Sequence, residues 1–557
     1  MNMLAIVLLA TITPNDPGIM GGEDSASIQA AVDAAQKSGG GEVVIPAFNA
    51  RTGKAGWEIA RSIRLPSGMT VVIDNATLRM KDGVYENFFR SANVWVPGEL
   101  TADRELHDIR ILGRGRAVLD GGRMNDLCEP TSCKDGRPHV RANMPIHFVN
   151  VRDFEVSGLR IENHRYWGMC YTFCRRGVIR DICFVARYDR RNQDGINLRN
   201  GSREIVIENI SGQTGDDTIA LSAIDRRRDD AWNTWVEGKS PDIENVVIRN
   251  VRSAAVRHPV VAIRAQNGAK VRDVTLENIS DAPWYVQPTG KYDLPRYAVI
   301  RLGEWHYLSS SPSALGDIRN ITIRNVTCRY SDVAVVVNTS LQDAYIGSVK
   351  CYGPCAGVLT TEGPGWGGAG ATLDNVTVAD SLVESDAPKS FVVDDAYVGE
   401  GDFLRDFRIV NSTVVRNGRR ELVRFDSRDS GAKVEPVALE ECVRIRKWNG
   451  LYFLAPDASE GSFTTKPFHP DSDDPEMDWE YGGTVSVECS TAPDADGRPG
   501  EWSEFRQVVR ASRITCPKGA YLRYRVVLRR DGPVEPHFIL MLVGETKQTR
   551  WEGKGLK

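Results

Sequence analysis

Three aspartates that could act together lie within residues 192–220. Asp194 precedes a glycine in the run N-Q-D-G, and the pair Asp216 and Asp217 follows a glycine in G-D-D-T-I-A, 22 residues further on. If each period forms one coil of a solenoid, residues one period apart stack on the same face, which brings Asp194 near the pair. Crowded carboxylates repel one another, and one of them is then driven to keep its proton. The spacing therefore predicts an acid and a base side by side.

An acid beside a carboxylate is what hydrolysis of a glycosidic bond requires. The acid protonates the leaving oxygen, while the carboxylate activates a water molecule. The same residues are compatible with a calcium site or with a solvated, aspartate-rich turn, and an adjacent Asp-Asp pair alone does not separate these readings. The stacked third aspartate, with glycines that keep the backbone close, favours catalysis.

The composition limits the classes of function. The chain has 557 residues, 70 of them basic and 74 acidic, and its net charge of -4 gives no overall field that would attract nucleic acid. The apolar run at residues 4–10 is too short to span a bilayer, and it fits the core of a signal peptide or a buried first strand. No other segment is long and apolar enough to cross a membrane. We therefore expect a secreted or periplasmic protein with no nucleic-acid or membrane partner.

The cysteines give no metal-ligand spacing. There are 11 of them, scattered along the chain. Near neighbours could form local disulfides, and buried free thiols are an equal alternative. The near neighbours are Cys128 with Cys133, Cys170 with Cys174, and Cys351 with Cys355. Neither a metal nor another cofactor is predicted.

The scaffold that must position the aspartates is a repeat. Short β-branched runs recur along the chain, and most end in a charged residue followed by Asn. Two or three short strands per repeat of roughly 20 to 30 residues, with Asn and Gly at the corners, predict a parallel β-helix. The asparagines are expected to stack as a ladder inside the coil, each amide bonding the next. The runs include residues 71–75, 109–113, 205–210, 246–251, 274–279 and 321–326.

The ends of the repeat mark the predicted domains. Residues 24–35 are predicted to form an amphipathic helix that, with a strand at 42–46, caps one end of the solenoid. The repeat fades after residue 415, and alternating runs beyond about residue 431 indicate a β-sandwich module. The predicted parts are a leader at 1–17, the β-helix at 18–430 and the sandwich at 431–557. Insertions at 96–106, 126–144, 225–240 and 280–296 are predicted to wall a cleft around the aspartates.

The two aspartate motifs, set inside β-helix repeats, resemble those of glycoside hydrolase family 28, the polygalacturonases. The opening S-I-Q-A-A-V-D-A-A, with G-G-G and V-V-I-P, is similar to the entry of that pectin-active superfamily of right-handed parallel β-helices. The resemblance covers residues 20 to 420 and implies an all-β protein and an inverting hydrolase that needs no metal. It matches Asp194 to the aspartate of an N-T-D motif, with Gln193 in place of threonine. It makes Asp216 the general acid and Asp217 the second member of the pair.

The resemblance also implies roles for the basic residues around the aspartates. Asp194 and Asp217 would hold the nucleophilic water. Inversion requires acid and base carboxyl groups about 6.5 to 9.5 Å apart so that water fits between them, which neighbouring coils can provide. The family's G-H-G motif is not intact, and His258, one coil after the pair, either substitutes for it or is a structural corner residue. The R-I-K motif is also missing, although Arg264 and Arg301 follow apolar runs that point to the same face. The family holds the carboxylate of its substrate with the basic residues of this motif. The loss of the motif therefore argues against simple pectate as the substrate, but it leaves the hydrolytic core.

Other side chains are predicted to line the cleft. Trp167, one coil before Asp194, could stack on a sugar face, and Arg199 could meet an anionic sugar or simply solvate a turn. The predicted substrate-binding residues are Asn192, Arg264, Arg301, Trp167, His164 and Arg199. Weaker candidates are Tyr166, Arg190, Arg191, Glu304, Trp305 and His306.

The leading prediction is therefore an inverting glycoside hydrolase that acts on an acidic or otherwise decorated polysaccharide or oligosaccharide. One alternative is a calcium-dependent β-helix polysaccharide lyase, in which Lys or Arg removes the proton beside a uronate carboxylate and the aspartates ligate calcium. The other is a non-catalytic β-helix adhesin or carbohydrate-binding protein. The sequence specifies no oligomeric state, and in all three cases the expected partner is a carbohydrate.

Overall fold

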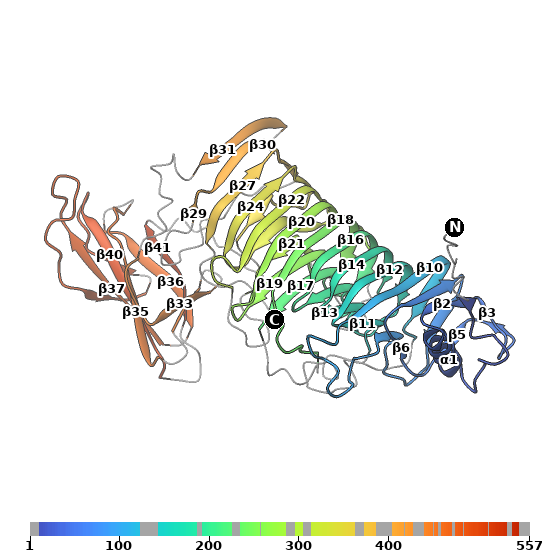
Figure 1. Cartoon of the computed structure of the whole chain (residues 1–557). Helices are drawn as coiled ribbons and strands as arrows, with labels where there is room; N and C mark the ends of the chain where they lie inside the picture. Colours follow the sequence, from blue (N-terminus) through green and yellow to red (C-terminus); the bar gives the residue numbers. More distant parts are fainter. Residues whose placement is uncertain are drawn as a thin grey trace, which may run out of the picture. The chain divides into compact units, whose positions relative to one another are not determined.

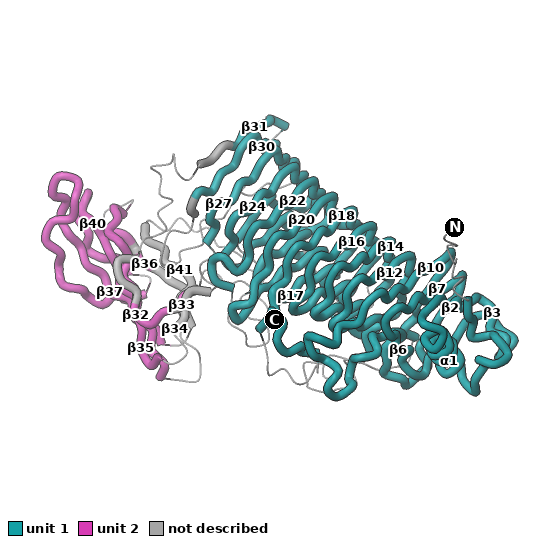
Figure 2. The backbone as a smooth tube through the Cα atoms, viewed as in Figure 1, with its two compact units in different colours: residues 1–366, 371–393, 404–430 teal, residues 367–370, 394–403, 431–557 magenta. Residues whose placement is uncertain are grey.

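In the computed structural model, the chain divides into two compact units, coloured separately in Figure 2. Unit 1 comprises residues 1–366, 371–393 and 404–430, and unit 2 comprises residues 367–370, 394–403 and 431–557. The residues that the structure describes are 11–122, 143–186, 192–225, 234–256, 258–285, 296–304, 313–361, 372–385, 404–416, 418–426, 439–448, 451–454, 458–470, 474–482, 484–510, 512–531 and 537–544.

Unit 1 is a coil of parallel strands (Figure 1). Strands of successive coils pair in register, so that Ile179, Ile207, Ile248 and Leu276 follow one another down a single interior file. All four side chains are buried. A stack of this kind buries one continuous apolar core, which no single repeat could do alone. The predicted all-β fold, a right-handed parallel β-helix, is confirmed.

The coils are built from a long, bent sheet and a shorter, straighter one. The long sheet contains β1 (Thr11–Ile12), β2 (Gly41–Pro46), β5 (Trp57–Ile59), β7 (Met69–Asp74), β8 (Thr77–Met80), β10 (Leu106–Asp120), β12 (Val151–Glu162), β14 (Arg175–Val185), β16 (Arg203–Thr214), β18 (Ile243–Ala255), β20 (Val271–Asp281), β22 (Ile318–Cys328), β24 (Leu341–Gly347), β25 (Lys350–Gly353), β27 (Leu373–Ala379), β28 (Leu382–Ser385), β29 (Leu404–Arg405), β30 (Arg408–Arg416) and β31 (Arg419–Asp426). The shorter sheet contains β6 (Ile63–Leu65), β9 (Phe89–Ser91), β11 (Ile146–Val149), β13 (Met169–Thr172), β15 (Ile196–Arg199), β17 (Ile219–Ile224), β19 (Val261–Gln266), β21 (Arg296–Leu302), β23 (Ser331–Val337) and β26 (Leu359–Thr360). β3 (Phe48–Asn49) and β4 (Lys54–Ala55) form a separate hairpin.

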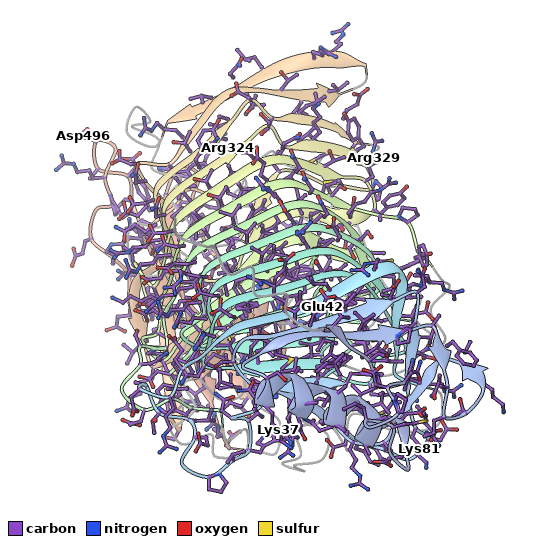
Figure 3. The ribbon with its side chains drawn as sticks, turned by 45° about the vertical axis from the view of Figure 1, so that its right-hand side comes forward. Lys37, Glu42, Lys81, Arg324, Arg329 and Asp496 are labelled. Carbon is purple, nitrogen blue, oxygen red and sulfur yellow. The ribbon has the colours of Figure 1, made fainter. Side chains whose placement is uncertain are left out.

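The two sheets differ in what covers their outer faces. On the long sheet, charged side chains alternate with the apolar interior files, as Glu42 of β2 and Arg324 of β22 illustrate in Figure 3. On the shorter sheet, β11, β13, β15, β17 and β19 are buried at every position. Their outward-facing side chains are therefore covered by other parts of the chain. This covered face is where the candidate site lies.

The predicted asparagine ladder exists, but it lies outside the coil rather than inside it. Asn250 donates an amide hydrogen bond to Asn209 (Nδ2 to Oδ1, 3.1 Å) and accepts one from Asn278 (2.9 Å), and all three side chains are exposed. Each residue has a φ of 56 to 58°. Asparagine tolerates this left-handed conformation better than most residues, because its short polar side chain bonds locally. The asparagines therefore mark the bends of the long strands, and the interior stays apolar.

Replacing Asn250 with alanine is expected to lower the free energy of unfolding by about 2 kcal/mol. The change removes two exposed hydrogen bonds and places a Cβ without a compensating bond in a left-handed bend. Asn250→Gly, which suits the bend but also loses the bonds, should cost less. Chemical denaturation of both variants tests this, and an alanine variant as stable as the glycine variant would contradict the role of the bend.

One helix caps the coil, as predicted. The helix α1 (Asp24–Lys37) buries Ile28, Ala31, Val32 and Ala35, which recur at helical spacing. It contacts β2, β5 and β6 at the start of the coil. It therefore covers the apolar end that an open stack would expose.

Unit 2 is a β-sandwich, as the sequence predicts. Two antiparallel sheets enclose a core that includes Phe463, Met477, Val487 and Leu522. One sheet contains β32 (Leu439–Val443), β35 (Glu460–Thr465), β37 (Thr484–Ala492), β38 (Arg506–Val508) and β40 (Tyr521–Arg529). The other contains β33 (Ile445–Trp448), β34 (Leu451–Leu454), β36 (Glu476–Gly482), β39 (Ser512–Arg513) and β41 (His537–Gly544).

The structure bears on several smaller expectations. Cys170, Cys174, Cys351 and Cys355 are free thiols, whereas Cys128 and Cys133 lie outside the described residues. Residues 1–10, which include the apolar run at 4–10, also lie outside them, and the short strand β1 that follows pairs with β2 without being buried. Within the described part of the chain, no helix combines the length and the apolar character needed to cross a membrane.

Candidate active site

Strand register brings the three aspartates together. Ile196 of β15 pairs with Ile219 of β17, so Asp194 and Asp217, each two residues earlier, occupy equivalent positions in neighbouring coils. The backbone continues this pairing, because the amide of Gly195 donates to the carbonyl of Asp217 (2.9 Å). The 23 residues from Asp194 to Asp217 are thus one coil. Asp216 precedes Asp217 and lies at the same edge of the sheet.

Gly195 permits this close approach. A Cβ built at this position would lie 2.3 Å from the carbonyl oxygen of Thr218 and 2.9 Å from the ring of Phe184. Both distances are shorter than any contact that packed atoms tolerate, and backbone cannot yield as a flexible side chain can. The glycine of the N-Q-D-G motif therefore keeps the coil of Asp194 tight against the coil of the pair.

Asp194 is buried, and among the described residues no cation forms an ion pair with its carboxyl group. Its side chain accepts one hydrogen bond, from Asn197 (Nδ2 to Oδ2, 3.2 Å), and the residue is 5% exposed. Its Oδ1 has no hydrogen-bond partner among the described residues. Burial, followed by repulsion from Asp216 and Asp217, raises the pKa of Asp194 well above the usual aspartate value. Asp194 therefore tends to keep its proton.

Asp216 is the most accessible carboxylate of the three. Its side chain is 16% exposed, compared with 1% for Asp217. Its Oδ1 accepts a hydrogen bond from the amide of Asp217 (2.9 Å) and lies 3.1 Å from Nδ1 of His258. Burial raises the pKa of Asp216, and the opposing effect of His258 does not cancel this. A group that holds its proton and still reaches solvent is suited to act as an acid.

Asp217 behaves in the opposite way. Its Oδ2 is paired with Nη2 of Arg264, and its Oδ1 lies 3.7 Å from Nη2 of Arg301 and 3.9 Å from Nδ1 of His258. Burial alone would raise the pKa of Asp217, but Arg264, Arg301 and His258 outweigh burial and lower it. Asp217 therefore carries the negative charge of the trio.

The two arginines are held by a second acid, Glu304. Arg264 pairs through Nε with Glu304 and donates from Nη1 to Ser222 (3.2 Å), while Arg301 lies 3.3 Å from the same Glu304 oxygen. Arg264 is 5% exposed, Arg301 2% and Glu304 3%. Both guanidinium groups are therefore committed to carboxylates of the protein itself. This differs from the expectation that they stand ready for the carboxylate of a substrate.

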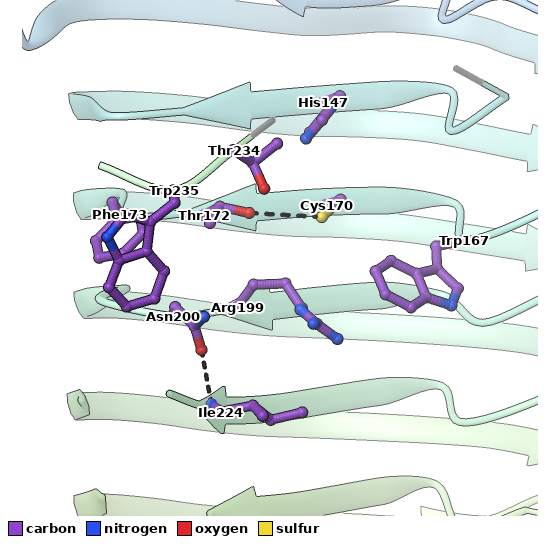
Figure 4. A pocket seen from close by; sticks show the side chains of 10 residues that line it. All are labelled: His147, Trp167, Cys170, Thr172, Phe173, Arg199, Asn200, Ile224, Thr234 and Trp235. Carbon is purple, nitrogen blue, oxygen red and sulfur yellow. Dashed lines mark hydrogen bonds between the residues drawn. The ribbon is translucent and has the colours of Figure 1, made fainter. Parts of the chain in front are cut away.

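The remaining predicted residues are distributed around this centre. Trp167 and Arg199 line a pocket next to the aspartates, in which the Arg199 guanidinium lies over the Trp167 ring at 5.0 Å (Figure 4). Asn192 is 8% exposed, with a φ of 60°. His164 was expected to line the cleft, but it is fully buried against Phe184 and is not among the residues of that pocket. Arg190, Arg191, Trp305 and His306 lie outside the described residues.

Some members of the site were missed or undervalued. Asn197 was not predicted, although its place between Ile196 and Leu198 in an alternating strand puts it on the outer face. Ser222 shares an outer file with Arg264, since the two residues are paired in register. Glu304 was only a weak candidate, because nothing in its local sequence shows that it also meets Arg264 of another coil.

Asp216, Asp217 and His258 could together hold a metal ion. One oxygen each from Asp216 and Asp217 and a ring nitrogen of His258 lie within 4.8 Å of one another. Carboxylate oxygens and an imidazole nitrogen are ligands that divalent cations accept. The positive charges of Arg264 and Arg301 beside Asp217 act against a cation at the same place.

Comparison with known proteins bears on the family. The sequence model of Glycosyl hydrolases family 28 matches residues 105–239, a segment that contains the three aspartates and ends before His258. Polygalacturonase QRT2 of Arabidopsis thaliana is 28% identical over 118 residues, which span 21% of this chain and 26% of that protein. The predicted resemblance to glycoside hydrolase family 28 is confirmed.

Solved structures of similar fold include two enzymes. The A-module of mannuronan C-5 epimerase AlgE6 of Azotobacter vinelandii is 14% identical, with 73% of this chain and 98% of that chain covered and a TM-score of 0.46. An exopolygalacturonase of Thermotoga maritima is 13% identical, with 75% and 94% covered and a TM-score of 0.44.

Proposed function

We propose that this chain is an inverting glycoside hydrolase that cleaves a uronate-containing polysaccharide, with Asp216 as general acid and Asp217 as base. The observation that carries the proposal is the unequal surroundings of three carboxyl groups in two adjacent coils: Arg264 and Arg301 lie beside Asp217, whereas Asp216 lies beside His258. The pKa of Asp216 and Asp194 is raised and that of Asp217 is lowered. Titratable groups whose environments push their pKa values apart are suited to divide acid and base roles.

The acid step falls to Asp216. Its Oδ1 is engaged by the Asp217 amide and by His258, which leaves Oδ2 to carry the proton toward the glycosidic oxygen. The proton moves to the leaving oxygen as the bond to the anomeric carbon breaks. His258 then stabilises the carboxylate that Asp216 becomes. This assigns His258 a supporting role in catalysis rather than that of a corner residue.

The water step falls to Asp217 and Asp194. Two carboxylate oxygens, Oδ1 of Asp217 and Oδ1 of Asp194, have no hydrogen-bond partner among the described residues. Buried acceptors of this kind need a donor, and a water molecule held by both supplies one. Asp217 accepts the proton of that water, because the arginines keep it ionised. Asp194, which tends to stay protonated, orients the water rather than deprotonating it.

The pH profile follows from these roles. Because Asp217 must be ionised, kcat/KM falls as the pH drops through its pKa, which lies below the usual aspartate value. Because Asp216 must be protonated, kcat/KM falls again as the pH rises through its pKa, which lies above that value. We therefore expect a bell-shaped profile with one limb below and one limb above the usual aspartate pKa, measured by initial rates over a pH series. A rate that keeps rising into the alkaline range would contradict the role of Asp216.

The activity itself is tested on defined polysaccharides. The chain is incubated with galacturonate, glucuronate and mannuronate-guluronate polymers, and both new reducing ends and ultraviolet absorbance are followed. A hydrolase yields reducing ends without the unsaturated product of a lyase, and chelator leaves its rate unchanged. The clustered ligands of Asp216, Asp217 and His258 favour the calcium-dependent lyase as second candidate. An absorbing product that disappears in chelator would select it.

Polymers of this kind lie outside cells. We therefore propose that the chain works in an extracellular or periplasmic space, with a polysaccharide or oligosaccharide as its partner.

A further inference from the structure

Three buried cysteines lie close together in unit 1, further along the coil than the aspartates. Cys328 ends β22, and it is paired in register with Cys351 of β25 in the next coil. Cys355 lies four residues after Cys351, where a hydrogen bond from its amide to the carbonyl of Tyr352 (3.2 Å) closes a turn. All three side chains are fully buried, and all three are free thiols. The turn thus brings a third thiol to a registered pair.

Cys355 contacts both of the other thiols. Its Sγ accepts side-chain hydrogen bonds from Cys328 and from Cys351. These two bonds lower the pKa of Cys355 to about 5, although burial opposes them. Burial raises the pKa of Cys328, and the bond to Cys355 raises that of Cys351. Because the thiolate is the nucleophile in thiol chemistry, Cys355 is the reactive member of the three.

The remaining contacts of these sulfurs are weak. The thiol of Cys328 lies 3.3 Å from the carbonyl oxygen of Ser331, and that of Cys355 lies 3.5 Å from the carbonyl oxygen of Gly357. A thiol is a poor hydrogen-bond donor, so little is lost when these contacts are given up. A disulfide needs a sulfur–sulfur distance of about 2.05 Å, which small side-chain rotations supply from hydrogen-bond contact.

Cys174 provides a contrast within the same unit. Its Sγ donates to the carbonyl oxygens of Phe148 and Thr172, both at 3.5 Å. Burial raises the pKa of Cys174 to about 12, so the side chain stays a thiol at ordinary pH. A buried thiol bonded to the backbone in this way is inert, which makes Cys174 a matched control for Cys355.

The shorter sheet is sparsely paired beside the three cysteines. Among the described residues, β23 and β26 are paired in register at two positions, whereas β17 and β19 are paired at six. Fewer pairs mean fewer backbone hydrogen bonds between neighbouring coils. Cys328 lies three residues before β23 begins, and Cys355 lies four residues before β26 begins. A covalent bond between them would join the two coils where the hydrogen-bonded ladder is short.

We propose that Cys355 is the centre of a redox site, in which it forms a disulfide with Cys328 that joins two coils and into which Cys351 exchanges. The site lies outside the catalytic centre of the proposed function and does not depend on it. Such a bond stabilises the fold chiefly by restricting the unfolded chain, since it closes a loop between residues 328 and 355.

The oxidant is a small disulfide such as oxidised glutathione. The Cys355 thiolate attacks one sulfur of this donor and releases one thiol. Cys328 loses its proton and attacks the sulfur of Cys355, which releases the second thiol. The protein loses two electrons and two protons, and the donor gains both as its two thiols. Because all three sulfurs are buried, the reaction takes place during folding, before the coil closes. Exchange with Cys351 is redox-neutral, because its thiolate displaces that of Cys328 from Cys355.

Peptide mapping of the full chain tests the proposal without any substitution. Chain secreted into an oxidising compartment is compared with chain made in a reducing cytosol, and both are alkylated in denaturant before digestion. Trypsin cleaves after Arg324, Arg329 and Lys350, and chymotrypsin cleaves after Tyr352, so the three cysteines fall in separate peptides.

In the secreted chain we expect Cys355 in a disulfide with Cys328, together with a fraction bonded to Cys351. In the cytosolic chain all three should be alkylated. Alkylation of Cys355 that is equally complete in both samples would overturn the proposal, as would a bond between Cys328 and Cys351.

Single substitutions separate the centre from its neighbours. Cys351→Ser should keep the bond to Cys328, Cys328→Ser should keep the bond to Cys351, and Cys355→Ser should leave both neighbours as thiols. Reductant should lower the melting temperature of the secreted wild type and of Cys174→Ser by about 2 to 6 °C, and that of Cys355→Ser by less. An equal shift in the Cys355 variant would place the stabilising bond elsewhere and overturn the proposal. These measurements use no substrate, so their failure is distinct from failure of the proposed function.

Discussion

Asp216→Asn is expected to lower kcat by about a hundredfold to ten-thousandfold, the range that general acid catalysis contributes. Asparagine has the shape of aspartate and still accepts the hydrogen bond from the Asp217 amide, so the coil should be preserved. It cannot donate the proton that the leaving oxygen needs. Initial rates at the optimal pH measure the effect, and substrate binding should change much less than kcat.

The matched control is Asp108→Asn. Asp108 is an exposed aspartate of β10 in the left-handed conformation, which asparagine also tolerates. Its change should leave kcat unaltered. If the Asp216 variant retained full activity, the chain would be using another acid or another reaction.

Arg264→Met is expected to have the largest effect on stability, about 3 to 5 kcal/mol. Arg264 is paired with both Asp217 and Glu304, which are almost completely buried. Removing one partner of a buried ion pair leaves uncompensated charge, which costs more than the pair contributed. The loss should also raise the pKa of Asp217 and move the acidic limb of the pH profile upward. Denaturation curves and the pH dependence of kcat/KM measure the two effects.

Arg249→Met supplies the comparison for this change. Arg249 pairs with Glu208 on the outside of the long sheet, where its side chain is 48% exposed. An exposed pair of this kind contributes about 0 to 1 kcal/mol. A variant of Arg264 no less stable than the variant of Arg249 would mean that the buried network does not hold the site together.

The repeat could be predicted because every coil obeys the same local rules. β-Branched residues alternate between interior and exterior, and asparagines follow at a fixed distance. Each repeat of the sequence therefore predicts both the coil and its register. The predicted position of the ladder was wrong. The sequence pattern shows that asparagines recur at the position of Asn250, but it does not show that the backbone there is left-handed. That bend turns the side chain outward.

The candidate site, too, could be predicted only in part. Asp194 and Asp217 could be paired from their spacing, because one coil separates them. The pairing of Arg264 with Glu304 could not, since it depends on which side chains meet across coils of unequal length.

The central claim is that Asp216 and Asp217 act on opposite faces of the sugar ring. The most direct measurement is proton NMR of a uronate oligosaccharide during its first minutes with the wild-type chain, before the products equilibrate. We predict that the new reducing end appears with the anomeric configuration opposite to that of the bond cleaved. Appearance of the same configuration as in the substrate would contradict the single displacement by water on which the roles of Asp194, Asp216 and Asp217 depend.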